Sequence, residues 1–170
     1  MKHKVPNVNF RVRELGEWVT KTSDDYFKGK RVVVFGLPGA FTPTCSSKQL
    51  PGYETKYNEI KERNIDEVYC ISVNDSFVMN AWAKHYNIQN VKVLPDGNSE
   101  FTSGMGMLVE KSNLGFGKRS WRYVAIISGG TTEKIFEEPG REDNCPGDPY
   151  GVTSPQNILS YLKGEDYKEK

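Results

Sequence analysis

Residues 31–47 read RVVVFGLPGAFTPTCSS, and this stretch decides the fold and the chemistry that we expect. Val32–Phe35 is a continuous apolar run, which is typical of a strand buried on both faces. Thr42 is a favourable helix N-cap, and Pro43 suits the first position of a helix. The pattern therefore predicts a strand, a Gly/Pro turn and a helix whose first turn contains Cys45.

Cys45 occupies a position at which a thiol can be reactive. Free backbone N–H groups and the positive end of the helix dipole favour a negative charge in the first turn of a helix. The thiolate is the reactive form of cysteine, so such a position favours reactivity. The alternative is a small buried hydrophobe, as many unpaired cysteines are. The place of Cys45 directly after a strand and a turn favours the reactive interpretation.

The rest of the chain alternates between strand-like and helix-like segments. Pro51 lies inside the helical pattern that follows Cys45 and predicts a kink there. The further segments that we predict are a hairpin within 7–20, strands at 68–73, 91–94, 121–127 and 131–136, and helices at 76–86 and from Ser154 to Gly164. A Pro/Gly-rich loop, 137–151, precedes the last helix. We therefore expect one α/β domain over residues 1–170, with a mixed central sheet flanked by helices and an N-terminal β-hairpin.

The composition excludes several classes of function. A chain of 170 residues with a net charge of +1 and no long run of one sign gives no indication of binding to nucleic acid or to an anionic membrane. No apolar stretch has the length of a membrane span, and the N-terminal residues become polar before a signal-peptide core could form. We therefore expect a soluble, cytoplasmic protein.

The three cysteines, Cys45, Cys70 and Cys145, are an odd number and lie far apart in the sequence. They form no Cys-x-x-Cys pair, which argues against a disulfide-stapled fold, a structural zinc site and a dithiol oxidoreductase. Cys70 lies in the middle of a predicted strand, so we expect it to be buried. Cys145 lies in the long loop, where it is either a resolving thiol for an oxidised Cys45 or an exposed loop residue. A cysteine protease needs a histidine base, and His3 and His85 have no flanking motif.

Arg122 is a second unusual residue. It alternates with Val124 and Ile126 and so shares a face of the predicted strand with apolar side chains. Because an unpaired buried charge is costly, Arg122 either reaches solvent from an edge strand or faces a polar site. In a site, this permanent cation can stabilise a thiolate and hold a polar oxygen substrate. Thr42 lies close enough to Cys45 in the sequence to share hydrogen bonds with such a substrate. Pro38 has no N–H to donate, so it can line the pocket without binding water.

The segment Pro38–Cys45 resembles a known active-site motif. It fits the Pro-x-x-x-Thr-x-x-Cys pattern of peroxiredoxins, in the form found in the peroxiredoxin 5 subfamily, also called type II or atypical. The similarity continues through Gly52–Tyr53, Cys70–Val78 and Arg122–Tyr123 and so covers most of the chain. The resemblance implies a thioredoxin-like fold.

The resemblance also implies a thiol-dependent peroxidase that reduces hydrogen peroxide and organic hydroperoxides. Cys45 would be the peroxidatic nucleophile, which the peroxide oxidises to sulfenic acid. Thr42 and Arg122 match the activating residues of the family, and Pro38 would shield the reactive sulfur. The electrons would come from an external thiol reductant, without a cofactor or a metal.

The family further suggests how the enzyme is recycled and with what it associates. In some relatives a resolving cysteine lies just before the last helix, where Thr153 or Ser154 stands here. Cys145 lies several residues earlier, so we favour a one-cysteine cycle with glutathione and glutaredoxin, or thioredoxin, as reductant, and keep Cys145 as the alternative resolving thiol. Family members of this type commonly form homodimers, to which Phe77 would contribute. The alternative function is a redox-sensing or binding module of the same fold with little turnover.

Overall fold

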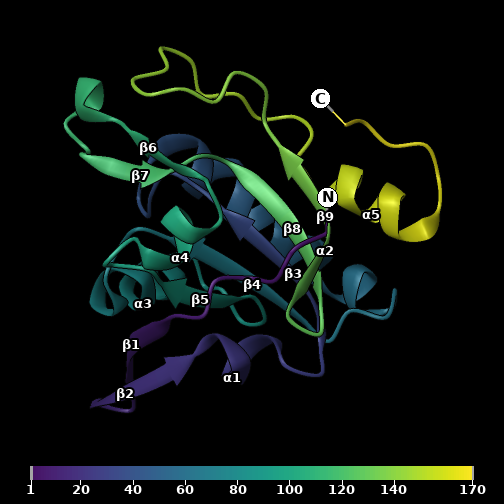
Figure 1. The fold of residues 1–170 in the computed structure, drawn as a ribbon, viewed down its shortest axis with the longest axis horizontal. Coiled ribbons are helices and arrows are strands. Elements are labelled where there is room, and N and C mark those ends of the chain that lie inside the picture. The colour runs from purple at the N-terminus through teal and green to yellow at the C-terminus, as the bar shows by residue number, and fades with distance from the viewer. Residues whose placement is uncertain (1, 170) are drawn as a thin grey trace.

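The structure, a computed structural model, describes residues 2–169, and within them five strands form the central sheet (Figure 1). The strand order is β5-β4-β3-β8-β9, in which β3, β4 and β5 are parallel and β8 is antiparallel to both β3 and β9. The sheet is therefore mixed, as predicted. The strands are β1 (Asn9–Glu14), β2 (Glu17–Thr22), β3 (Arg31–Gly36), β4 (Glu67–Ser72), β5 (Lys92–Pro95), β6 (Leu108–Glu110), β7 (Lys118–Ser120), β8 (Tyr123–Ser128) and β9 (Thr131–Glu137).

Helices cover the sheet and are all short. α2 has 12 residues and is the longest helix in the part of the chain that the structure describes. None of the helices within residues 2–169 has both the length and the apolar character that crossing a bilayer requires. The helices are α1 (Ser23–Phe27), η1 (Cys45–Gln49), α2 (Leu50–Lys61), α3 (Ser76–His85), α4 (Glu100–Gly104), η2 (Ser112–Leu114) and α5 (Pro155–Lys163).

Alternate residues of the central strands point into two hydrophobic clusters. Val33 and Phe35 of β3 belong to the first cluster, together with side chains from α2, α3 and α5. Val32 and Val34 belong to the second cluster, together with side chains from β1, α1 and α4. Because successive side chains of a strand point to opposite faces, the two clusters fill opposite faces of the sheet. This explains the continuous apolar run in β3, which is buried from Val32 to Gly36.

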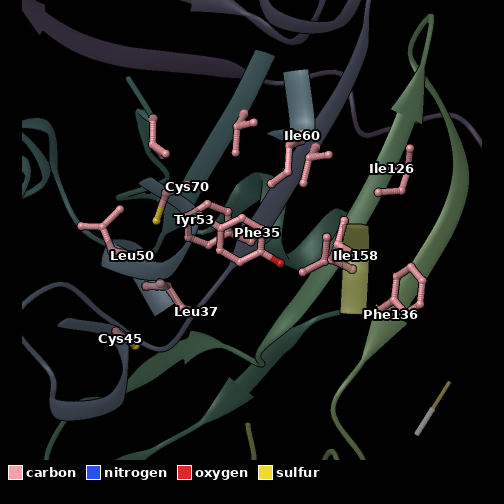
Figure 2. Close-up of a cluster of buried hydrophobic side chains, with 14 of the residues drawn as sticks. Phe35, Leu37, Cys45, Leu50, Tyr53, Ile60, Cys70, Ile126, Phe136 and Ile158 are labelled. Carbon is pink, nitrogen blue, oxygen red and sulfur yellow. The ribbon is translucent and has the colours of Figure 1, made fainter. Parts of the chain in front are cut away.

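The first cluster includes the candidate nucleophile (Figure 2). Phe35 and Tyr53 stack with ring centroids 4.1 Å apart in this cluster. Cys45 lies at its margin, beyond Leu37. The hydrophobic core thus includes Leu37, Ala40 and Cys45 of the segment that follows β3.

The helix that follows the Gly/Pro turn begins with a π-helical turn. Residues 45–49 form η1, in which the N–H of Leu50 donates to the carbonyl of Cys45. Pro51 follows at the start of α2, where its missing N–H is tolerated. The irregularity that we expected at Pro51 therefore takes the form of a widened turn just before it, a feature that accompanies kinks in helices.

The hairpins and helix ends agree with the sequence patterns in most places. Gly129 and Gly130 both have positive φ, 58° and 84°, and join β8 to β9 as a tight hairpin. Ser154 caps α5, and Gly164 ends it in the left-handed conformation. The β6–β7 hairpin and α4 were not predicted, because strands and helices this short carry no clear periodicity.

Candidate active site

Cys45 lies where β3 gives way to a helix. β3 ends at Gly36, and helical backbone begins at Pro43, with the carbonyl of Thr42 accepting from the N–H of Ser46 at 3.0 Å. The Cys45 side chain is buried, with 1% of the residue exposed. A thiolate at such a position needs compensation for the water that it has lost.

Arg122 provides that compensation from a segment that is distant in the sequence. β8 pairs antiparallel with β3, and Tyr123 lies opposite Gly36, so Arg122 comes next to the loop that follows β3. The Nη1 atom of Arg122 donates to Cys45 Sγ at 3.4 Å. Arg122 is 2% exposed. It therefore faces Cys45, and the alternative in which it reaches solvent from an edge strand is wrong.

The strand that carries Arg122 begins later than predicted. We expected a strand over 121–127, but β8 covers Tyr123–Ser128. The reason is that Trp121 bonds outside this sheet, whereas the Arg122 carbonyl still bonds to the residue that follows β9. The N–H of Trp121 donates to the Met107 carbonyl at 2.7 Å, and the Arg122 carbonyl accepts from the N–H of Glu138 at 3.2 Å.

The Arg122 guanidinium has further partners in addition to the sulfur. Nη1 also donates to Gln49 Oε1, and Nη2 donates to Asp148 Oδ1 at 2.6 Å. The ring of Tyr150 lies 5.7 Å from its central carbon. Burial by itself would lower the pKa of Arg122, but the interactions with Cys45 and Asp148 outweigh it and raise the pKa above its ordinary value. Arg122 is therefore a permanent cation in this site.

Thr42 contributes an oriented hydroxyl group three residues before Cys45. Its Oγ1 donates to the Gly39 carbonyl at 2.6 Å, rather than accepting from a helix N–H within residues 2–169. The side-chain cap predicted for Thr42 is therefore not formed, because the tight turn brings the Gly39 carbonyl closer. With its proton engaged, the hydroxyl has lone pairs left to accept a hydrogen bond from a substrate.

Pro38 is buried in the same turn, and a second arginine covers it. Nη1 of Arg119, on β7, donates to the Pro38 carbonyl at 3.2 Å. A Cβ on Gly39 would come within 2.4 Å of this Nη1, so a glycine makes the close approach possible. Burial lowers the pKa of Arg119, and interaction with Cys45 opposes this shift. Arg119 is thus a second cation near the sulfur.

A buried tryptophan holds the helical turn that contains Cys45. Trp82 of α3 is fully buried, and its Nε1 donates to Ser46 Oγ at 3.0 Å. Because Ser46 is the residue after Cys45, this bond fixes the first turn of the helix against α3. The side chain of Asn74 acts similarly on the turn before Cys45, because its Oδ1 accepts from the N–H of Ala40 at 3.0 Å.

The other cysteines lie in different surroundings. All three cysteines are free thiols. Cys70 is fully buried in β4, as predicted, and burial raises the pKa of its thiol well above the ordinary value, so it stays protonated. Cys145 is partly buried and packs against the second cluster, whereas Cys45 belongs to the first. His85 is exposed at the end of α3.

The structure adds three polar residues to those that the sequence predicts: Gln49, Arg119 and Asp148. Gln49 lies four residues after Cys45, a spacing that places both on one side of a helix and could have indicated it. Asp148 has no such local signal. No group of three or more histidine, cysteine, aspartate or glutamate side chains within residues 2–169 is arranged to hold a metal ion.

Comparison with known proteins assigns the chain and its fold to one family. The Redoxin family model matches residues 2–147. A peroxiredoxin from Rhizobium etli is 58% identical over 172 residues, an alignment that covers 96% of this chain and 96% of that protein. Peroxiredoxins are thiol-dependent peroxidases.

Solved structures agree with this assignment. The Plasmodium falciparum antioxidant protein, a 1-Cys peroxiredoxin, is 38% identical with a TM-score of 0.91, covering 96% of this chain and 99% of that one. Reduced Prx3 from Vibrio vulnificus in complex with H2O2 is 34% identical with a TM-score of 0.85, covering 95% and 94%. The chain belongs to the peroxiredoxin family. It is therefore an oxidoreductase with a thioredoxin-like fold that reduces a peroxide with electrons from a thiol, and the resemblance seen in the sequence is confirmed.

Proposed function

We propose that Cys45 is the peroxidatic nucleophile and that Thr42, Arg122 and Pro38 form the site around it. The observation that carries this proposal is the 3.4 Å contact between Arg122 Nη1 and Cys45 Sγ, made by an arginine that is 2% exposed. A buried permanent cation at this distance stabilises the thiolate. It also stabilises the negative charge that develops when the peroxide bond breaks.

In the proposed reaction the Cys45 thiolate attacks one oxygen of hydrogen peroxide or an organic hydroperoxide. The S–O bond forms as the O–O bond breaks, and the sulfur becomes a sulfenic acid. The other oxygen leaves with the bonding electron pair and takes up a proton, which gives water or an alcohol. Arg122 donates hydrogen bonds to the peroxide oxygens, and the Thr42 hydroxyl, which donates its own proton to Gly39, accepts from the peroxide O–H. Pro38 shields the sulfur.

The sulfenic acid is then reduced by an external thiol in a one-cysteine cycle. A first thiol displaces water and forms a mixed disulfide with Cys45, and a second thiol releases the Cys45 thiolate. We propose glutathione with glutaredoxin, or thioredoxin, as the reductant. The packing of Cys145 against the second cluster supports this choice over a Cys45–Cys145 disulfide, and a similar protein is itself described as a 1-Cys peroxiredoxin.

A further part of the proposal is a cytoplasmic homodimer with Phe77 at the contact. Phe77 is 57% exposed and makes an edge-to-face contact with Trp18, itself 47% exposed, with ring centroids 5.4 Å apart. Exposed aromatic surface of this kind marks interaction sites. Free thiols suit a reducing compartment. Light scattering after size exclusion should give a dimer for the protein and a monomer for Phe77→Glu, and an equal mass for both would contradict the contact.

The test of the catalytic cycle is peroxide consumption by two cysteine variants. With hydrogen peroxide and either reductant system, Cys45→Ser should abolish turnover, while the matched control Cys145→Ser should retain it. Loss of turnover in Cys145→Ser, with a Cys45–Cys145 disulfide in the oxidised protein, would contradict the one-cysteine cycle. Stoichiometric oxidation of Cys45 without turnover would instead favour the redox-sensing module.

A further inference from the structure

Asp148 contacts the guanidinium of Arg122 through a different nitrogen from the one that contacts Cys45. Nη2 donates to Asp148 Oδ1 at 2.6 Å, while Nη1 donates to Cys45 Sγ and Gln49 Oε1. The Arg122 side chain is 2% exposed, and the Asp148 side chain is 49% exposed. Because a guanidinium is a rigid plane, a partner that fixes Nη2 also fixes the direction in which Nη1 points.

The loop that carries Asp148 is tied down at its base. The buried Glu138 carboxylate accepts from the N–H of Gly151 at 2.9 Å, and from the N–H and hydroxyl of Thr153 at 3.0 and 2.6 Å. These bonds close the segment 138–153 into a ring that starts next to Arg122 and returns to the N-terminus of α5. Within this ring, Tyr150 also contacts Arg122, with its ring 5.7 Å from the central guanidinium carbon. The position of Asp148 is therefore set by the fold of the loop.

The charge of Asp148 has the wrong sign to activate Cys45 directly. A carboxylate beside Arg122 reduces the positive potential that the sulfur experiences, so it does not favour the thiolate. What Asp148 supplies is orientation, since a charge-assisted hydrogen bond of 2.6 Å holds the guanidinium in one direction. Arg122 Nε has no hydrogen-bond partner within residues 2–169, so the Nη atoms alone orient the group.

We propose that Asp148 is a positioning residue for peroxide reduction, which holds the Arg122 guanidinium so that it meets the peroxide oxygens at Cys45. This inference rests on the roles proposed above for Cys45 and Arg122. With this role for Asp148, the loop 138–153 is a part of the active site, and it acts on the sulfur through Arg122.

The test compares two reactions of the same thiolate in single-turnover experiments. Reduction of hydrogen peroxide needs an oriented Arg122, whereas alkylation of Cys45 by iodoacetamide needs only the thiolate. Asp148→Asn should lower the second-order rate constant for hydrogen peroxide about tenfold. Alkylation of Cys45, followed by mass spectrometry at the same pH, should stay equal to that of the unchanged protein or become faster. Asp148→Glu, which restores a carboxylate, should recover part of the lost peroxide rate.

Two controls make the result decisive. Asp143→Asn removes a carboxylate from the same loop at a residue that accepts from the N–H of Glu110, and it should leave both rates unchanged. Asp148→Ser serves as a second variant if the asparagine variant fails to fold. A peroxide rate within twofold of the unchanged protein, or an equal fall of both rates, would overturn the proposal. Full activity in Arg122→Gln would instead contradict the role of Arg122 itself.

Discussion

Replacing Arg122 by glutamine removes the cation that contacts the Cys45 sulfur and should lower the rate constant for hydrogen peroxide about 10²–10³-fold. The magnitude follows from the geometry. Unit charges 3.4 Å apart interact by about 5 kcal/mol at an effective dielectric constant of about 20. Water that enters the vacated space recovers part of this energy. The loss of one preorganised donor to a developing charge typically costs about 2.7–4 kcal/mol of activation free energy, which corresponds to the expected 10²–10³-fold fall in rate.

The assay is stopped-flow oxidation of Cys45 by excess hydrogen peroxide, with thermal unfolding as the check on folding. Arg122→Lys is the matched control, because it keeps the charge but lacks the planar fork that contacts the sulfur, Gln49 and Asp148 together. It should fall between the unchanged protein and the glutamine variant. A folded Arg122→Gln protein that reacts within fivefold of the unchanged rate would refute the electrostatic reasoning.

Three further substitutions test other parts of the structure. Gly36→Ala should lower the free energy of unfolding in urea by about 2–3 kcal/mol, since its Cβ would lie 2.3 Å from the buried Tyr123 ring, and an unchanged value would contradict this packing. Gly39→Ala should slow peroxide reduction severalfold with little loss of stability, because the Cβ displaces only the flexible end of Arg119, and an unchanged rate would show that Arg119 is dispensable. Glu133→Gln should cost about 1 kcal/mol near neutral pH. The hydrogen bond from Arg31 lowers the pKa of Glu133, so its contribution is complete above the ordinary value of 4.5 and is lost as the pH falls through the lowered value. The difference between the two proteins in urea unfolding should therefore shrink as the pH falls below 4.5, and a constant difference would exclude the ion pair as its source.

The sequence predicts those parts of the fold that local patterns determine. The apolar run Val32–Phe35 identifies a central strand, because both of its faces are covered. The Gly/Pro turn then places Cys45 at a helix start, where the structure has it. The alternation of Arg122 with Val124 identifies Arg122 as a charge on an apolar face. It does not identify the thiol that Arg122 contacts.

The remaining parts of the site depend on contacts between distant segments. Asp148 reaches Arg122 only because Glu138 closes its loop through hydrogen bonds to Gly151 and Thr153. No local pattern in a Pro/Gly-rich segment reveals such a closure. The same holds for Arg119, whose strand has only three residues and pairs with an equally short partner. These contacts are set by tertiary structure, which overrides the weak local preferences of loops and short strands.

The π-helical turn makes the length of the chain between Cys45 and Pro51 a constraint in its own right. The bond from the Leu50 N–H to the Cys45 carbonyl spans one residue more than the corresponding bond of an α-helix. Each residue turns an α-helix by about 100°. Deletion of the exposed Ser47 would therefore rotate Cys45 by about this angle relative to α2, and its sulfur would no longer point at Arg122. A deletion that removes none of the reactive side chains would thus disrupt the active site, as substitution of those side chains would.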